Sequence, residues 1–127
     1  MKIIGNNVLI TGGASGIGRI MGRMALEKGA KSLIIWDINQ ESLSTTKSEF
    51  ATLGNVYTYS VNIADSDAVI ATYQRVKDEC GDVDILINCA GSGISGAVEF
   101  TQLEDAERQM ARFTPHDGWS EEFPITA

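Results

Sequence analysis

The hydrophobic positions of this chain alternate between short continuous runs and stretches with helical spacing. The continuous runs predict strands over residues 7–11, 32–37, 56–61 and 83–91, the last of which runs into a loop of small residues. The stretches between them predict helices, because apolar side chains recur there every three or four residues. Strands that are apolar on both faces are typical of a parallel sheet covered by helices on both sides. We therefore expect an α/β fold: a three-layer, doubly wound parallel sheet of about four strands.

Turn and capping residues mark where the predicted helices begin and end. The first helix is expected to end at Gly29, and Asn39 and Asp65 are the predicted N-caps of the next two. A further helix is predicted after a capping box formed by Thr101 and Glu104. The large apolar residues that give the first helix its spacing are Ile17, Ile20, Met21 and Met24.

Composition and charge narrow the classes of function. The chain has 127 residues, of which 43% are hydrophobic and 21% charged, and its net charge is -7. This charge argues against nucleic acid or an anionic membrane as a partner, because both require basic patches. Cys80 and Cys89 lack metal-ligand spacing, and the single histidine, His116, cannot complete a zinc site. No apolar run reaches the length of a signal peptide or a membrane span, so we expect a cytoplasmic domain.

A glycine-rich turn, TGGASGIGR over residues 11–19, follows the first predicted strand and opens the first predicted helix. The N–H groups at a helix N-terminus are unpaired and attract phosphate, and a Cβ in front of them would block its approach. Gly12 would allow the tight exit from the strand, Gly16 the close approach of a pyrophosphate, and Gly18 the packing of helix on sheet. Thr11 and Ser15 offer hydroxyls to the loop or to the phosphates.

Asp37 ends the second predicted strand about 20 residues after the last of these glycines, where an acidic residue accepts hydrogen bonds from an adenosine ribose. Its charge would repel a 2′-phosphate, and no basic residue lies within GGAS, residues 12–15, to offset it, which favours NAD(H) over NADP(H). An alternative interpretation is that Asp37 caps the following helix.

In this order, the motifs resemble those of the short-chain dehydrogenase/reductases, a family of single-domain nicotinamide oxidoreductases with a Rossmann-like fold. The resemblance is carried by TGGASGIG after the first strand, by Asp37 in WDIN after the second, and by NCAG (Asn88 to Gly91) after the fourth. It covers about residues 2–110, and taken together the ordered motifs are specific.

The resemblance implies further contacts to the cofactor. Asn62 stands where the family usually has Asp, and its amide oxygen can accept from the adenine amino group, while the backbone at Ile63 would meet the ring's other edge. Asn88 matches the first Asn of the family's N-N-A-G, with Cys89 in place of the second. The expected cofactor-binding residues are therefore Gly12, Ser15, Gly16, Ile17, Gly18, Asp37, Ile38, Asn62, Ile63, Asn88, Ala90 and Gly91.

The family's catalytic residues are not predicted in this chain. Family chemistry uses Y-x-x-x-K with an upstream Ser: the tyrosine transfers a proton, and the lysine lowers the pKa of the tyrosine hydroxyl. Only Tyr73 and Lys77 have this spacing, and they lie on the helix between the third and fourth strands. We interpret them as a core tyrosine and a surface lysine, and we predict no catalytic residue and no metal ligand.

We therefore expect the NAD(H)-binding portion of a short-chain dehydrogenase/reductase, inactive alone: a Rossmann half-domain over residues 1–112 and an irregular tail over residues 113–127. One alternative is activity in the presence of a complementing chain that supplies the missing Ser, Tyr and Lys. Another is a non-catalytic interaction or regulatory role beside a full-length relative. We expect the edge of the fourth strand to be exposed, and a homo-oligomer or a complementing chain would cover it.

Overall fold

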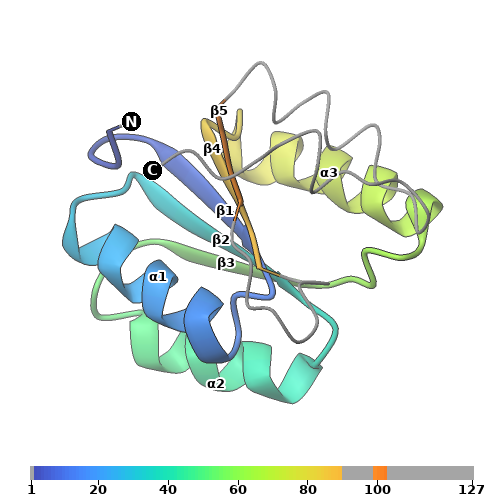
Figure 1. Cartoon of the computed structure of the whole chain (residues 1–127), viewed down its shortest axis with the longest axis horizontal. Helices are drawn as coiled ribbons and strands as arrows, with labels where there is room; N and C mark the ends of the chain where they lie inside the picture. Colours follow the sequence, from blue (N-terminus) through green and yellow to red (C-terminus); the bar gives the residue numbers. More distant parts are fainter. Residues whose placement is uncertain (1, 90–98, 103–127) are drawn as a thin grey trace.

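The computed structural model describes residues 2–89 and 99–102, which form a five-stranded sheet and three helices (Figure 1). The strands and helices up to residue 88 confirm the predicted alternation. None of the described helices is long and apolar enough to cross a bilayer. In chain order the elements are β1 (Asn7–Thr11), α1 (Gly16–Glu27), β2 (Ser32–Asp37), α2 (Gln40–Phe50), β3 (Val56–Ser60), α3 (Ser66–Cys80), β4 (Ile85–Asn88) and β5 (Glu99–Gln102).

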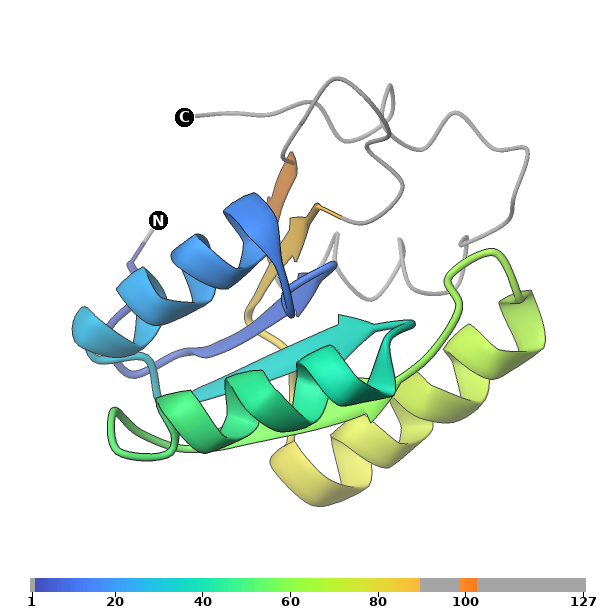
Figure 2. The same ribbon diagram turned by 90° about the horizontal axis from the view of Figure 1, so that it is seen from below.

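The sheet has the strand order β3-β2-β1-β4-β5, and β1 to β4 are parallel. Figure 2 shows β1, β2 and β3 side by side and pointing the same way. From β1 the chain first builds outward through β2 and β3, and then crosses back to place β4 on the other side of β1. The strand order thus reverses between β1 and β4, and in open α/β sheets ligands bind outside the carboxyl ends of the strands at such a point.

Helices cover both faces of the sheet, which confirms the doubly wound, three-layer architecture. Helices α1 and α2 lie on one face and α3 on the other (Figure 1). Alternate strand residues supply the two cores, because successive side chains point to opposite faces. Leu9, Ile34 and Trp36 belong to the core under α3, whereas Ile10 and Ile35 belong to the core under α1 and α2.

The predicted helix boundaries are confirmed in detail. The Asn39 Oδ1 accepts from the Ser42 N–H at 2.9 Å, and an Asp65 carboxylate oxygen accepts from the Ala68 N–H at 3.1 Å, so both residues are side-chain N-caps. Gly29 follows the end of α1 with a φ of 90°, in the left-handed region that glycine adopts at low cost.

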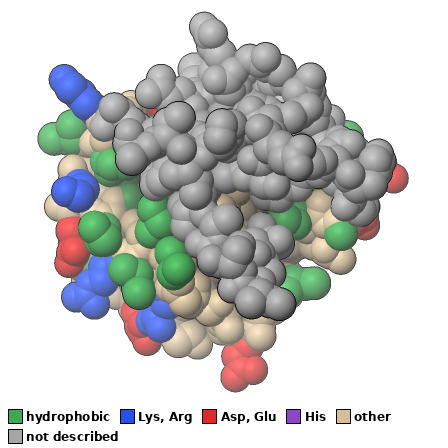
Figure 3. Space-filling model, viewed as in Figure 1, with side chains coloured by type: hydrophobic (Ala, Val, Ile, Leu, Met, Phe, Trp, Pro, Cys, Tyr) green, Lys and Arg blue, Asp and Glu red, His purple; other side chains and the backbone are tan. Residues whose placement is uncertain are grey.

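Most of the large apolar residues that were expected to pack α1 against the sheet are exposed. Ile17, Ile20 and Met24 are 50%, 61% and 48% exposed, and Figure 3 shows hydrophobic side chains gathered on the surface over this helix. The sheet-facing side of α1 is formed by its smaller residues, with one leucine. The buried residues of this helix are Gly18, Gly22, Ala25 and Leu26. Small side chains let the helix lie close to β1 and β2, and this packing leaves Ile17, Ile20 and Met24 outside, whereas Met21 packs partly buried against the core as expected.

The last described strand was not predicted. β5 pairs antiparallel with β4, so that Asn88 lies opposite Glu99 and Ile85 opposite Gln102. The edge of β4 is therefore covered by β5, and the expectation that this edge is exposed is wrong. Thr101 therefore lies inside a strand, which contradicts its expected place at the start of a capping box. The remainder of the predicted final helix and the division at residues 112 and 113 lie outside the described residues.

Candidate functional site

The carboxyl ends of β1 to β4 bring most of the predicted site residues to one edge of the sheet. Thr11 at the end of β1 lies in register with Trp36 of β2 and with Asn88 of β4, and Asp37 lies in register with Ser60 of β3. The glycine turn leaves this edge directly after Thr11. The site is therefore built by strand register, which places residues distant in sequence in one row.

The glycine turn adopts backbone angles that favour glycine. Gly12 and Gly16 have φ values of 70° and 56°, in the left-handed region. The Gly12 N–H donates to the Trp36 carbonyl oxygen at 2.7 Å, which fixes the turn to the end of β2. A Cβ built on Gly16 would meet no atom within 4 Å, so the space in front of this residue is open. The turn thus exposes backbone toward that space.

Gly18 is required for a different reason, the packing of α1 on the turn. A Cβ at Gly18 would lie 2.2 Å from the Gly12 carbonyl oxygen and 3.1 Å from the Gly13 Cα. Both contacts are with backbone, which a side-chain rotation cannot relieve. Gly18 therefore allows close packing, as expected, but against the turn, whereas the sequence predicted packing against the sheet.

The N-terminus of α1 differs from those of α2 and α3. Ser15 stands at its N-cap with extended backbone angles, but the Ser15 side chain is exposed and makes no capping hydrogen bond. Helices α2 and α3 each have a side-chain cap and an acidic residue in the first turn, and α1 has neither. Its partial positive charge is therefore offset neither by a capping side chain nor by a carboxylate in its first turn. A pyrophosphate placed before Gly16 would meet the α1 N–H groups and the Ser15 hydroxyl, so these residues fit an anionic dinucleotide.

Asp37 connects the glycine turn to the start of α2. Its Oδ2 accepts from the Ala14 N–H at 3.1 Å, and its Oδ1 accepts from the Asn39 N–H at 3.2 Å. Because Asn39 is the N-cap of α2, the alternative interpretation of Asp37 as the cap is wrong. Each carboxylate oxygen has a further lone pair, and Asp37 is only half-buried, so it can also accept hydroxyl groups. Ile38 is 67% exposed beside it and offers an apolar surface.

Asn88 lies at the carboxyl end of β4, paired with Thr11 at the end of β1. Its Oδ1 accepts from the Thr11 Oγ1 at 3.2 Å, and the same Oγ1 accepts from the Cys89 N–H at 3.2 Å. Asn88 is 2% exposed, and its Nδ2 has no hydrogen-bond partner among the described residues. Buried amide donors are normally paired, so this one marks a place for a further acceptor. Burial raises the pKa of the Cys89 thiol to about 11, which keeps the thiol protonated at neutral pH.

The adenine-side residues follow β3. Asn62 is exposed, and its Oδ1 accepts from the Ala64 N–H at 2.9 Å, so the oxygen expected to meet adenine already holds a turn and has one lone pair left. Ile63 is half-buried and packs against the core under α3. The expected cofactor contacts at Ala90 and Gly91 lie outside the described residues.

One site contact was missed in the sequence, and one predicted hydroxyl has an unexpected partner. The Ala14 N–H holds the Asp37 carboxylate, and this backbone group gives no sequence signal. The Thr11 hydroxyl, expected to serve the loop or the phosphates, donates to the Asn88 Oδ1 and so links β1 to β4.

Tyr73 and Lys77 do not form part of this edge. They lie on α3, where Tyr73 is half-buried against the core and Lys77 pairs with Asp82 at 3.3 Å. The interpretation of the pair as a core tyrosine and a surface lysine is confirmed. Within residues 2–89 and 99–102, no cluster of three or more His, Cys, Asp or Glu could hold a metal ion.

Comparison with known proteins identifies the family. The short chain dehydrogenase family matches residues 6–113, which is most of the chain. The chain belongs to this family. Members bind a nicotinamide dinucleotide, in agreement with the turn, the open α1 N-terminus and Asp37.

Curated relatives and solved structures agree with this assignment. Estradiol 17-beta-dehydrogenase 11 of Macaca fascicularis is 39% identical over 84% of this chain and 36% of its own length. Probable oxidoreductase EphD of Mycobacterium bovis is 36% identical over 82% of this chain and 18% of its own length. NAD+-bound xylitol dehydrogenase superposes with a TM-score of 0.64 at 25% identity over 68% of this chain and 33% of that chain. The RhlG/NADP complex of Pseudomonas aeruginosa gives 0.66 at 25% identity over 72% and 36%. The chain thus spans about a third or less of these proteins.

Proposed function

We propose that this chain is the NAD(H)-binding portion of a short-chain dehydrogenase/reductase. The observation that carries the proposal is the uncapped N-terminus of α1 behind a turn with left-handed Gly12 and Gly16. In this proposal the pyrophosphate lies in front of Gly16, where a Cβ would meet no protein atom. The adenosine ribose lies at Asp37, and adenine lies between Ile38 and the turn at Asn62.

The preference for NAD(H) rests on the charge at the ribose site. The Asp37 carboxylate is held by the Ala14 and Asn39 N–H groups and is therefore fixed at the turn. A fixed carboxylate accepts the two ribose hydroxyls well and repels a 2′-phosphate. Both NAD+ and NADP complexes occur among the similar structures, so membership of the family does not decide between the two cofactors. The proposed preference therefore rests on the residues of this chain.

When bound, the nicotinamide ring would accept or donate a hydride, with an alcohol or a carbonyl compound as the other partner. The residues of this chain would bind the dinucleotide and orient it at the carboxyl edge of the sheet. The buried Asn88 Nδ2 would donate to an acceptor at the nicotinamide end of the cofactor. No tyrosine–lysine pair lies at this edge in the described part of the chain, so we propose that the chain does not catalyse the transfer alone.

A role as an interaction partner is the second candidate, and the exposed face of α1 favours it. Ile17, Ile20 and Met24 are about half exposed or more, which is an unusual amount of large apolar surface on one short helix. Sedimentation velocity would distinguish the two candidates. A monomer that binds NAD+ supports the first, and a dimer or larger species that binds no nucleotide supports the second.

Calorimetric titration of the purified chain with NAD+, NADP+ and ADP-ribose tests the proposed function. We expect NAD+ and ADP-ribose to bind with similar dissociation constants, because the described contacts address the shared ADP-ribose part. We expect NADP+ to bind more weakly. Asp37→Ala should weaken NAD+ binding by about tenfold, the loss of hydrogen bonds to a charged acceptor. Absence of NAD+ binding to a folded chain would contradict the proposal.

A further inference from the structure

A cavity of about 200 Å³ lies next to the proposed ribose site. Ala14 and Asn39 line it, and their N–H groups are the ones that hold the Asp37 carboxylate, so the cavity adjoins that carboxylate. Its other walls come from Arg19 at the start of α1 and from Glu41 and three hydroxyl residues of α2. A substituent on the ribose hydroxyl nearest Asp37 would point toward this cavity.

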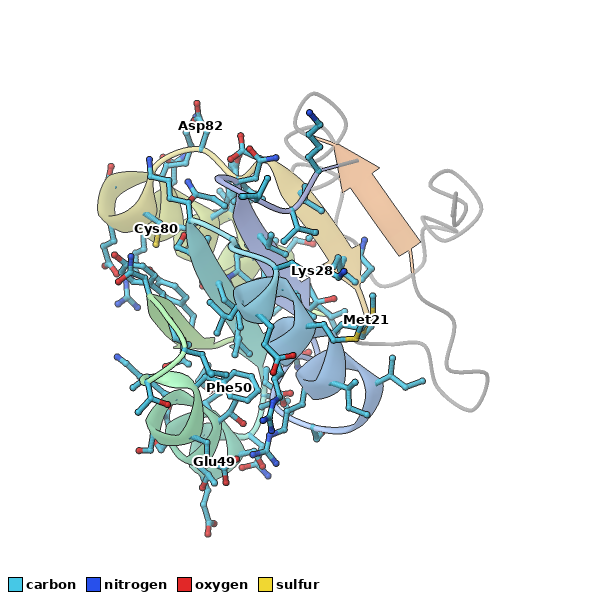
Figure 4. The ribbon with its side chains drawn as sticks, turned by 90° about the vertical axis from the view of Figure 1, so that its left-hand side faces the viewer. Met21, Lys28, Glu49, Phe50, Cys80 and Asp82 are labelled. Carbon is cyan, nitrogen blue, oxygen red and sulfur yellow. The ribbon has the colours of Figure 1, made fainter. Side chains whose placement is uncertain are left out.

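Among the described residues that line the cavity, only Arg19 is cationic, and two residues of α2 hold it. Its guanidinium forms an ion pair with the Glu49 carboxylate and lies over the Phe50 ring, 5.8 Å from the ring centroid. Figure 4 shows Glu49 and Phe50 on α2, with Phe50 directed toward α1. The side chains of Arg19 and Glu49 are 36% and 52% exposed, so water reaches the pair and the pair can open.

We propose that the Arg19–Glu49 ion pair strengthens the preference for NAD(H) that Asp37 sets, with Glu49 as a positioning residue that acts through Arg19. This inference rests on the proposed function. While Glu49 holds and neutralises Arg19, a 2′-phosphate in the cavity meets the negative charges of Asp37 and Glu41, and no other described residue that lines the cavity is cationic. Released from Glu49, Arg19 could turn its guanidinium into the cavity that it already lines and pair with the phosphate by two hydrogen bonds. NAD(H), which lacks the phosphate, gains nothing from the release.

The variant Glu49→Gln tests the proposal, and the chain supplies a matched control. Glu27 pairs with Arg23 on the same helix at 3.4 Å, and neither residue lines the cavity. Glu27→Gln therefore makes the same substitution and the same change of net charge, and also breaks an exposed Arg–Glu pair. The double variant Arg19→Gln/Glu49→Gln removes the cation that Glu49→Gln would release. For all four proteins, calorimetry gives the dissociation constant of NAD+, and displacement of NAD+ gives that of NADP+.

We expect Glu49→Gln to tighten NADP+ binding by about three- to fivefold, the range that an exposed ion pair supports, with NAD+ changed by less than about twofold. Glu27→Gln should leave both constants as in the wild type, and the double variant should lose the gain for NADP+. If wild type binds NAD+ but Glu49→Gln and Glu27→Gln bind NADP+ equally, the inference is wrong and the proposed function stands. If no folded variant binds either nucleotide, both are wrong.

Discussion

The substitution Gly18→Ala tests how closely α1 packs on the glycine turn. The new Cβ would lie 2.2 Å from the Gly12 carbonyl oxygen, so helix and turn would have to move apart by roughly 1 Å to restore an ordinary contact. Such overpacking costs about 1–3 kcal/mol, and the better helix propensity of alanine returns up to about 1 kcal/mol. We expect a net loss of about 1–2 kcal/mol in the free energy of unfolding, measured by urea denaturation followed by circular dichroism.

Gly22→Ala is the matched control on the same buried side of α1. There the new Cβ would lie 3.0 Å from a terminal methyl group of Leu33, which can shift without moving backbone. We expect its stability to stay within about 1 kcal/mol of wild type. Because only Gly18→Ala displaces the turn, it alone should weaken NAD+ binding, by about tenfold. Equal stability and equal NAD+ affinity of the two variants would refute the packing argument.

Other expected results concern capping and the thiol. Asn39→Ala should lower the free energy of unfolding by about 1 kcal/mol in the same urea assay, because it removes the α2 cap; no change would show that Ser42 finds another acceptor. Burial raises the pKa of Cys89 from 9.0 to about 11. Between pH 9 and about 11 the Cys89 thiol is ionised in the unfolded chain but still protonated in the folded chain. The free energy of unfolding should therefore fall as pH rises from about 9 to 11, and it should fall less in Cys89→Ser. Iodoacetamide should likewise modify native Cys89 slowly at pH 8, and rapid labelling there would contradict its burial.

The sequence predicts the strands and caps well because these depend on local signals. The strands coincide with short, continuous apolar runs that lack helical spacing. Asn39 and Asp65 each accept a hydrogen bond from an N–H group three residues ahead. The predicted positions of Gly12, Gly18 and Asp37 follow from the spacing of a turn between strand and helix. For these features, local chemistry and tertiary structure agree.

The features that the sequence did not predict depend on contacts between distant segments. The sequence did not predict which side of α1 faces solvent. The size and hydropathy of Ile20 and Met24 favour their burial, whereas close approach of the helix to the sheet favours burial of Gly22 and Ala25. β5 has no alternating pattern of its own and is defined by its pairing with β4. Likewise, the Arg19–Glu49 pair joins two helices, and no spacing rule relates residues so far apart.

The exposed apolar face of α1 is a candidate surface for association with another chain. Large apolar side chains on a helix are usually covered, and the buried small face of α1 is already occupied by the sheet. NAD+ binding at the N-terminus of α1 and association through its outer face would use separate surfaces of one helix. Both proposals can therefore be measured on the same protein preparation.

The most direct test of pyrophosphate binding at the glycine turn is a ¹H–¹⁵N correlation spectrum of the labelled chain, recorded while NAD+ is added. We expect the amide signals of residues 12–18 and of Asn39 to shift together and to saturate with one dissociation constant. The signals of Gly29 and Gly81, which follow the ends of α1 and α3, should not move. If NAD+ leaves the amides of the turn unchanged in a well-dispersed spectrum, the glycine turn does not hold the pyrophosphate and the proposed function is contradicted.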